Sequence, residues 1–243
     1  MGRTFKAMAA ISMAALALRA AAAESGEEKL ARSLAALLIA GRAVVAQSQP
    51  LINDASKGNK GFTPEVFGAA VTAEYKTKTG VDLAALDPSR AEQKRLKALF
   101  EAEKKVVAEA QDTINLQGMG FKGFTPAVFG RHTADKFREA AGLSLKQTSE
   151  KYRNPLNEPD AFEKRVLAKL AAPGWEKGKG YAEVVSAGGK KTLRYLQPLY
   201  IAAPCLTCHG DPKGELDVAG RAKEGYREGE LRGAVSVSVP VGK

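Results

Sequence analysis

Cysteine and histidine are scarce in this sequence, with two of each among 243 residues. Two cysteines form one disulfide at most, which excludes a small scaffold held together by several bridges. No apolar run reaches the roughly 20 residues that an uninterrupted membrane-spanning helix needs. A composition of 44% hydrophobic and 26% charged residues is instead typical of one or two globular domains.

Acidic residues are the minority among the charged ones: 27 Asp and Glu stand against 37 Lys and Arg, a formal net charge of +10. The two signs are interleaved along the chain, and no arginine-rich helix or aromatic-basic platform stands out. This pattern disfavours nucleic acid as a partner. It suits an anionic protein partner or a membrane surface, or serves solubility alone.

Residues 1–23 are predicted to be a signal peptide. Arg3 and Lys6 form a basic start, residues 7–18 form an apolar segment, and the alanines at 21–23 are small enough for signal peptidase. The mature chain is then expected to be an exported, periplasmic protein with no stable transmembrane span. A retained amphipathic or membrane-anchoring helix is the alternative.

An internal duplication is the strongest organisational signal. Residues 44–68 and 106–130 align without a gap at an offset of 62, and 15 of the 25 positions are identical. Each copy, taken as residues 44–83 and 106–145, predicts a helix, a glycine-containing loop and a second helix. Two copies are too few for a solenoid, so we expect one helical bundle.

The helices of the two copies have matching start and stop signals. Apolar residues recur every three or four positions over about 27–53 and 90–114, which predicts long helices. Thr63 and Thr125, each followed by proline, are predicted N-caps of the second helices. The glycines expected to end those helices are Gly80 and Gly142.

The second half of the chain predicts strands. Residues 181–186 and 193–201 flank Gly188-Gly189, which is a hairpin signal. Residues 234–241 alternate valine with serine or another residue, a pattern typical of a half-buried antiparallel strand.

Helices followed by a small sheet predict an α+β fold. A short helix is expected over about 160–171, between the duplicated helices and the strands. One domain is predicted over residues 24–243, with the sheet and the motif described next inside residues 175–241.

Residues 205–209 read Cys-Leu-Thr-Cys-His, the attachment signature of c-type haem. Cys205 and Cys208 would form thioethers with the two vinyl groups of one porphyrin, and His209 would bind the iron as proximal ligand. Because covalent attachment takes place in export compartments, it agrees with the predicted signal peptide. We therefore predict one covalently attached haem c.

Three other kinds of site use such cysteines. A zinc knuckle needs four ligands, and few are left beyond the motif. A thioredoxin-type redox pair opens a helix after a strand in a βαβ unit, whereas residues 210–214 have the composition of a loop. A structural disulfide is the third alternative.

The sixth iron ligand is left open by the sequence. Met119 is the only methionine after residue 23, and His132 is the only histidine besides His209. Both lie in the second repeat copy, where the first copy has Lys57 and Ala70. Met119, His132 or neither supplies the ligand; methionine would raise the reduction potential relative to histidine, and a vacant position would bind small gases.

A resemblance to a known family rests on four segments, residues 120–131, 152–160, 205–215 and 223–240. In their order and spacing, the chain resembles the exported PAS-like monohaem c-type proteins, a domain also found as the sensory part of membrane histidine kinases and chemoreceptors. The resemblance implies a PAS-like antiparallel sheet, long N-terminal helices packed against it, and haem attached at Cys205 and Cys208 with His209 as ligand. It also implies that Tyr226 and Arg232 pack near the haem.

The expected function is electron transfer by a haem protein to a periplasmic redox partner. We do not expect an enzyme, because the chain has little acid–base equipment for peroxide chemistry. The alternative is a redox or gas sensor acting through a separate signalling protein, which a PAS-like fold suits but does not establish.

Overall fold

The computed structural model describes residues 24–242, so the predicted signal peptide lies outside the described part of the chain. The fold is α+β with a PAS-like antiparallel sheet, as predicted. The described helices and strands are α1 (Gly26–Gln47), α2 (Gln49–Ile52), α3 (Pro64–Thr79), α4 (Ala91–Glu109), α5 (Gln111–Ile114), α6 (Pro126–Ala141), β1 (Ser144–Thr148), α7 (Ala161–Ala171), β2 (Tyr181–Ala187), β3 (Lys190–Tyr200), α8 (Leu206–His209) and β4 (Leu231–Pro240). Three short 3-10 turns cover Leu83–Ala85, Pro155–Asn157 and Ala203–Cys205.

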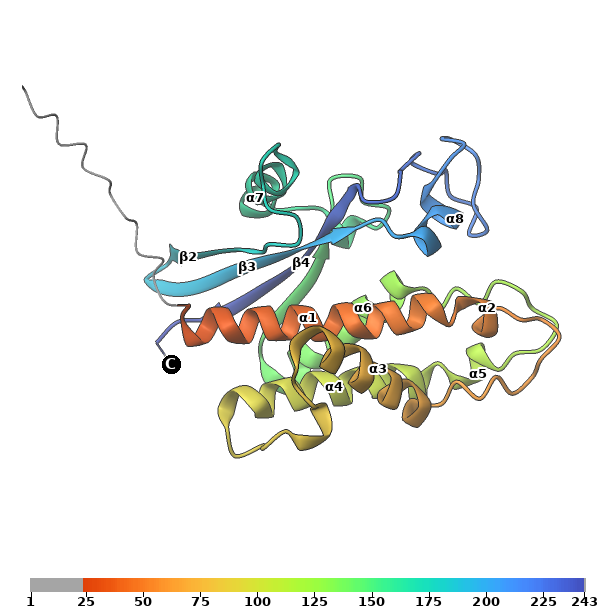
Figure 1. Ribbon diagram of the computed structural model, residues 1–243, viewed down its shortest axis with the longest axis horizontal. Helices are drawn as coiled ribbons and strands as arrows, with labels where there is room; N and C mark the ends of the chain where they lie inside the picture. Colours follow the sequence, from red (N-terminus) through yellow and green to blue (C-terminus); the bar gives the residue numbers. More distant parts are fainter. Residues whose placement is uncertain (1–23, 243) are drawn as a thin grey trace, which may run out of the picture.

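Helices cover both faces of the sheet (Figure 1). The strand order is β1-β4-β3-β2, with every neighbouring pair antiparallel. Helix α7 packs on one face, and α1 and α6 pack on the other, with α3 and α4 in a further layer behind them. The main core therefore lies between the sheet and the duplicated helices.

Helix α1 is the central element of that core. By length and composition it is apolar enough to cross a membrane, the one such helix within residues 24–242. More than half of its most apolar window is buried, however, by the sheet on one side and by α3, α4 and α6 on the others. The residues predicted to form its apolar face are all buried: Leu30, Leu34, Leu37, Leu38 and Val45.

The two repeat copies fold alike, with one correction to the predicted helices. Each long helix is divided near its end, at Ser48 between α1 and α2 and at Ala110 between α4 and α5. Pro50 has no backbone N–H, so it interrupts the hydrogen-bond ladder in the first copy. The second copy has Asp112 at that position and is divided all the same.

The predicted caps of the second helices are confirmed. The Thr63 Oγ1 accepts the backbone N–H of Val66 at 3.3 Å, and Thr125 makes the same bond to Val128 at 3.3 Å. Helices α3 and α6 then end at Gly80 and Gly142, with φ of 74° and 65°, a left-handed conformation that favours glycine.

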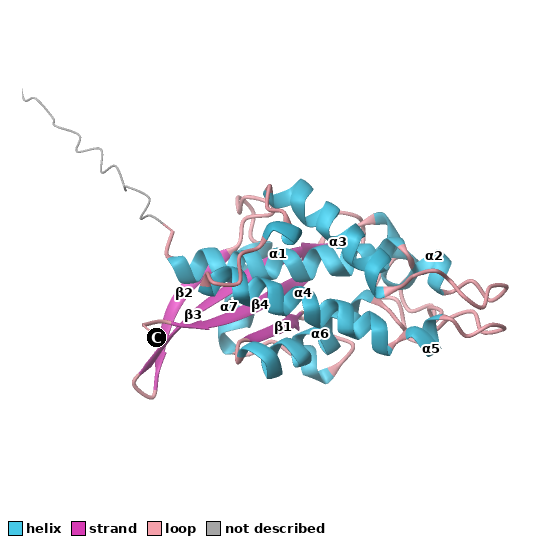
Figure 2. Ribbon diagram, turned by 90° about the horizontal axis from the view of Figure 1, so that it is seen from below, coloured by secondary structure: helices cyan, strands magenta, loops and turns pink. Residues whose placement is uncertain are grey.

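The loops of the two copies run side by side and exchange hydrogen bonds (Figure 2). The Asn53 Oδ1 accepts the backbone N–H of Lys122 at 2.9 Å, and the Asn115 Oδ1 accepts that of Lys60 at 2.9 Å. Asn53 and Asn115 are equivalent positions at the repeat offset, as are Lys60 and Lys122. The copies therefore form one unit related by an approximate two-fold axis.

The predicted hairpin is confirmed as β2 and β3. Gly188 and Gly189 form its two-residue turn with φ of 55° and 73°, the conformation that a tight hairpin of this twist requires. The strands are Tyr181–Ala187 and Lys190–Tyr200, within a few residues of the predicted limits.

Two details of the sheet differ from the predictions. Strand β1 pairs with β4 and lies outside residues 175–241, where the sheet was predicted. It was not predicted, because its five residues do not alternate between apolar and polar side chains as a half-buried strand does. The serine face of β4 is also less exposed to solvent than the predicted half-buried strand implies. Ser236 is 3% exposed, since α7 and the Arg194 side chain cover it.

Candidate functional site

The cysteine-histidine motif is a compact turn at the end of β3. After Tyr200, the backbone of Ile201 still pairs with the segment leading into β4, through hydrogen bonds of 2.9 and 2.8 Å to Glu230 and Gly229. Residues 203–205 then form a 3-10 turn that runs directly into α8, which holds Cys208 and His209. The sheet therefore fixes the point at which the motif begins.

The motif turns sharply after His209. A Cβ atom at Gly210 would lie 2.7 Å from the Leu206 carbonyl oxygen, so the turn requires glycine. Residues 210–230, here called the return segment, then fold back over the motif. The backbone N–H of Tyr226 donates to the His209 carbonyl at 2.8 Å, which holds the return segment against the histidine.

One ring nitrogen of His209 is bound by a carboxylate. The His209 Nδ1 lies 2.8 Å from the Glu224 Oε2, and both side chains are largely buried. This contact fixes the orientation of the ring and leaves Nε2 as the nitrogen able to bind a metal. A carboxylate on the far nitrogen is the usual arrangement behind a metal-binding histidine, and it strengthens the imidazole as a donor.

Arg153 holds Glu224 in place. Its guanidinium donates to both Glu224 oxygens at 2.6 and 2.8 Å, and to the Asp217 Oδ2 at 2.5 Å. It also donates to the backbone carbonyls of Cys208 at 2.7 Å and Ala222 at 3.2 Å. One side chain from the loop after β1 thus links the motif to two places on the return segment.

Burial and charge act in opposite directions on these groups. Burial alone would raise the pKa of Glu224, but the hydrogen bonds from Arg153 and His209 outweigh it and hold the pKa below its ordinary value. Burial, helped by the repulsion of Arg232 and Arg153, lowers the pKa of His209 despite its bond to Glu224. Burial and this repulsion favour the neutral imidazole, the form in which histidine binds a metal.

Tyr226 lies against the motif, and Arg232 lies against Tyr226; their packing near the haem, which the family resemblance implied, stays a prediction. The Tyr226 ring meets the His209 ring edge to face, with centroids 6.4 Å apart. The Arg232 guanidinium lies 5.6 Å from the centroid of the Tyr226 ring. Cys205 and Cys208 are free thiols and half-buried, so both remain open to attachment.

Met119 lies in the loop between α5 and α6, and its side chain is 46% exposed. Its carbonyl oxygen accepts a hydrogen bond from the Lys122 Nζ within the same loop. The motif is contacted by the return segment, by Arg153 from the loop after β1, and by α1 at the turn of residues 203–205. The part of Met119 as sixth ligand stays a prediction.

His132 is exposed on α6 and lines a surface pocket with Glu109, Thr113, Lys122 and Phe124. This pocket belongs to the second repeat copy, and no residue of the motif lines it. The part of His132 as sixth ligand likewise stays a prediction.

Sequence reasoning missed Arg153, Glu224 and Asp217 as site residues. Arg153 and Glu224 stand inside two of the four segments that carry the family resemblance, so their positions were singled out but not their roles. No sequence pattern indicated Asp217 as a site residue. Its Oδ1 accepts the backbone N–H groups of Ala219 and Arg221, at 2.8 and 2.9 Å, and this turn brings it to Arg153.

Comparison with known proteins gives a family match and one related structure. The family model described as Tll0287-like matches residues 20–240. The crystal structure of the cyanobacterial haem protein Tll0287 superimposes with a TM-score of 0.44 at 19% identity, covering 65% of this chain and 98% of that one. No curated protein matches this chain. Since the family model spans nearly all of the described residues, the chain belongs to the Tll0287-like family.

Proposed function

We propose that this protein is an exported monohaem c-type cytochrome-like protein that transfers electrons. The observation that carries the proposal is the pairing of His209 with Glu224 at 2.8 Å, next to two free thiols at the spacing of a haem attachment site. A histidine that binds a metal almost always has such a hydrogen-bond partner on its other ring nitrogen. Tll0287, from which the family takes its description, is a haem protein, and this agrees with the proposal.

The donor set suits haem. Cys205 and Cys208 would carry the thioether bonds, and the His209 Nε2 would bind the iron, which supplies one-electron chemistry when bound. Glu224 and Arg153 orient the imidazole, and the Tyr226 ring packs against it. The motif is also reachable from outside, because Thr207 between the two cysteines is exposed. This exposure would allow a bound haem to exchange electrons with a periplasmic partner protein.

The first test is a haem stain after denaturing electrophoresis of protein exported by a cell that matures c-type cytochromes. The wild-type chain should retain haem, and the variant with Cys205→Ser and Cys208→Ser should not. Colourless, correctly exported wild-type protein would end the proposal. A His209→Ala variant separates attachment from ligation, because it keeps both thiols while changing the absorption spectrum.

The second test separates electron transfer from sensing. Carbon monoxide added to the reduced protein should leave the spectrum unchanged if two firm ligands hold the iron. A fast, large shift would indicate an open position and favour a gas sensor acting through a separate partner. Spectra of Met119→Leu and His132→Ala then identify the sixth ligand, and both candidates fail if neither spectrum changes.

A further inference from the structure

A groove lies between the helices of the second repeat copy, beside the loop that joins α5 to α6. Its volume is about 260 Å³, and we call it the second-copy groove. Four of its lining residues are apolar: Val106, Ala110, Phe124 and Val128. Its polar lining residues are Glu109, Thr113, Lys122 and His132. A concave, largely apolar surface with a few convergent polar groups is typical of a site for a small molecule.

The first repeat copy shows which features of the groove are specific to the second. Five of the nine lining residues are identical in the two copies at the offset of 62. At the positions of Glu109, Ala110, Thr113 and His132, the first copy has Gln47, Ser48, Leu51 and Ala70.

The differences change both the space and the chemistry of the groove. Leu51 is partly buried and packs against the core, whereas the shorter Thr113 is exposed. Glu109 and His132 bring a carboxylate and an imidazole to positions that are uncharged in the first copy. Because the two copies otherwise fold alike, these polar groups are not required by the helix-loop-helix unit itself.

One cation of the groove has no carboxylate partner. Glu109 is bound by Lys136, one turn after His132 on α6, at 2.7 Å. Lys122 is buried, and within residues 24–242 its Nζ donates to the Met119 carbonyl rather than to a carboxylate. An ammonium group has three donor hydrogens, so Lys122 can donate further bonds. A charge in this position favours an anionic ligand.

The nearby carboxylates do not neutralise Lys122. Asp54, in the neighbouring loop, pairs with Lys57 at 3.9 Å. Asp112 is exposed and does not line the groove. Lys60, the repeat equivalent of Lys122, is a second buried cation that donates to backbone carbonyls of its own loop. The groove therefore has one unpaired positive charge, which suits a single carboxylate.

We propose that the second-copy groove binds a small monocarboxylate with an apolar body, at a site separate from the haem. The apolar body would lie on Phe124 and Val128, and the carboxylate would accept hydrogen bonds from Lys122 and His132. A ligand with an ammonium group fits less well, because Lys136 already binds the carboxylate of Glu109. A dicarboxylate would exceed the one unpaired charge.

The test is a titration of the exported protein with three probes that share a benzene ring and differ in charge: benzoate, benzyl alcohol and benzylammonium. Isothermal titration calorimetry measures the affinity, and NMR shifts of backbone amides locate the site. Benzoate should bind most tightly and should shift the amides of Phe124 and Val128. The haem absorption spectrum should stay unchanged, since no residue of the attachment motif lines the groove.

Three variants each give the groove the residue of the first copy, which shows that the repeat unit accommodates it. His132→Ala removes a donor to the carboxylate and should weaken benzoate binding about tenfold. Thr113→Leu fills part of the groove and should abolish saturable binding. Glu109→Gln removes a carboxylate that repels benzoate and should strengthen binding. Circular dichroism verifies that each variant is folded.

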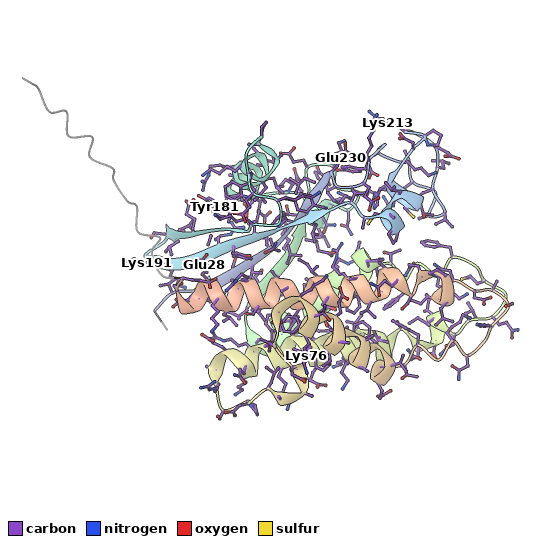
Figure 3. The ribbon with its side chains drawn as sticks, in the orientation of Figure 1. Glu28, Lys76, Tyr181, Lys191, Lys213 and Glu230 are labelled. Carbon is purple, nitrogen blue, oxygen red and sulfur yellow. The ribbon has the colours of Figure 1, made fainter. Side chains whose placement is uncertain are left out.

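Two further variants are controls. Ala70→His places an imidazole at the equivalent position of the first copy, where Leu51 remains, and should leave the benzoate affinity unchanged. Lys76→Gln removes an exposed cation in the last turn of α3 (Figure 3) and should also leave it unchanged. Equal losses in Lys76→Gln and His132→Ala would overturn the inference, because benzoate would then follow the overall positive charge.

Absence of saturable benzoate binding by the folded wild-type protein would overturn the inference, and so would tighter binding of benzylammonium. Benzoate binding that persists in both Thr113→Leu and His132→Ala would assign the probe to another place and reject the groove. A benzoate-induced change in the haem spectrum that is lost in His132→Ala would assign this histidine to the iron, which also contradicts the inference.

Discussion

Phe67 and Phe129 pack edge to face with ring centroids 5.3 Å apart and an angle of 60° between the rings. They are the same position in the two repeat copies, 62 residues apart. A residue that touches its own repeat equivalent must lie close to the axis that relates the copies. Gly41 and Glu103 show the same relationship, because a Cβ on Gly41 would lie 2.7 Å from the Glu103 carboxylate. The axis therefore passes through the core of the helical bundle.

Removing either aromatic ring should destabilise the whole bundle. Phe67→Ala and Phe129→Ala are each expected to lower the free energy of unfolding by about 3–5 kcal/mol, because both side chains are fully buried. The double variant should lose less than the sum, by about 0.5–1.5 kcal/mol, the share that belongs to the ring pair. Urea unfolding followed by circular dichroism measures this. Phe121→Ala, in a loop and half-buried, is the control with a smaller loss. Fully additive losses would mean that the two rings are not coupled.

The two hydrogen bonds that Asn53 and Asn115 accept from the opposite repeat copy should contribute equally to the free energy of unfolding. Asn53→Ala leaves the buried Lys122 backbone N–H without its acceptor, and Asn115→Ala does the same to Lys60. Each change is expected to cost about 1–3 kcal/mol, the penalty for an unsatisfied buried polar group. In each variant, the hydrogen-exchange rate of the backbone amide that lost its acceptor, at Lys122 or Lys60, should rise.

Asn59→Ala provides the comparison for that experiment. Asn59 is exposed in the same loop, and its Oδ1 accepts a hydrogen bond from the nearby Gly61 N–H, at 2.8 Å. Its replacement should change stability by a few tenths of a kcal/mol, as surface substitutions usually do. Equal losses of stability in Asn59→Ala and Asn53→Ala would show that the hydrogen bonds between the two repeat copies do not stabilise the protein.

Glu103 should make the protein less stable as pH rises. Its carboxyl is fully buried with no hydrogen-bond partner among the described residues, and burial raises its pKa well above the ordinary value of 4.5. Above pH 4.5 the unfolded chain releases this proton, whereas the folded chain retains it. The free energy of unfolding should then fall by up to about 1.4 kcal/mol per pH unit until the pH passes the folded pKa.

Glu103→Gln removes that dependence, because the amide does not titrate in this range. The variant should match the wild-type stability near pH 4 and exceed it near pH 8, as measured by urea unfolding at both values. Glu101→Gln, on the exposed side of α4, should leave the pH profile nearly unchanged. Parallel profiles for the wild type and Glu103→Gln would contradict the assignment.

Glu224 should lower the reduction potential of the bound haem. Its carboxylate accepts from the His209 Nδ1, which makes the imidazole a stronger donor and stabilises the oxidised iron. Glu224→Gln weakens that interaction, so the potential should rise, and potentiometric titration of the holoprotein measures the change. Glu215→Gln, an exposed carboxylate paired with Lys223, is the control. A potential that falls or stays constant in Glu224→Gln would show that the carboxylate only positions the return segment.

The sequence by itself determined the local elements. Repeated apolar spacing, threonine-proline starts and glycine ends predicted the duplicated helices, because these signals act within a few residues of chain. The two-glycine turn predicted the β2–β3 hairpin in the same way. The Cys-Leu-Thr-Cys-His motif predicted Cys205, Cys208 and His209 as haem-binding residues, because its spacing suits the two vinyl groups and the iron of one porphyrin.

Only the tertiary structure decided how distant segments meet. Arg153, Glu224 and Asp217 come together from positions up to 71 residues apart, and nothing in their local sequence indicates that one arginine binds both carboxylates. Strand β1 exists because β4 offers it a paired edge, not because its own five residues favour a strand. The pairing of Phe67 with Phe129 likewise depends on how two similar units dock. Short-range patterns determine helices and turns and predict the attachment chemistry, whereas the contacts that orient His209 depend on long-range packing.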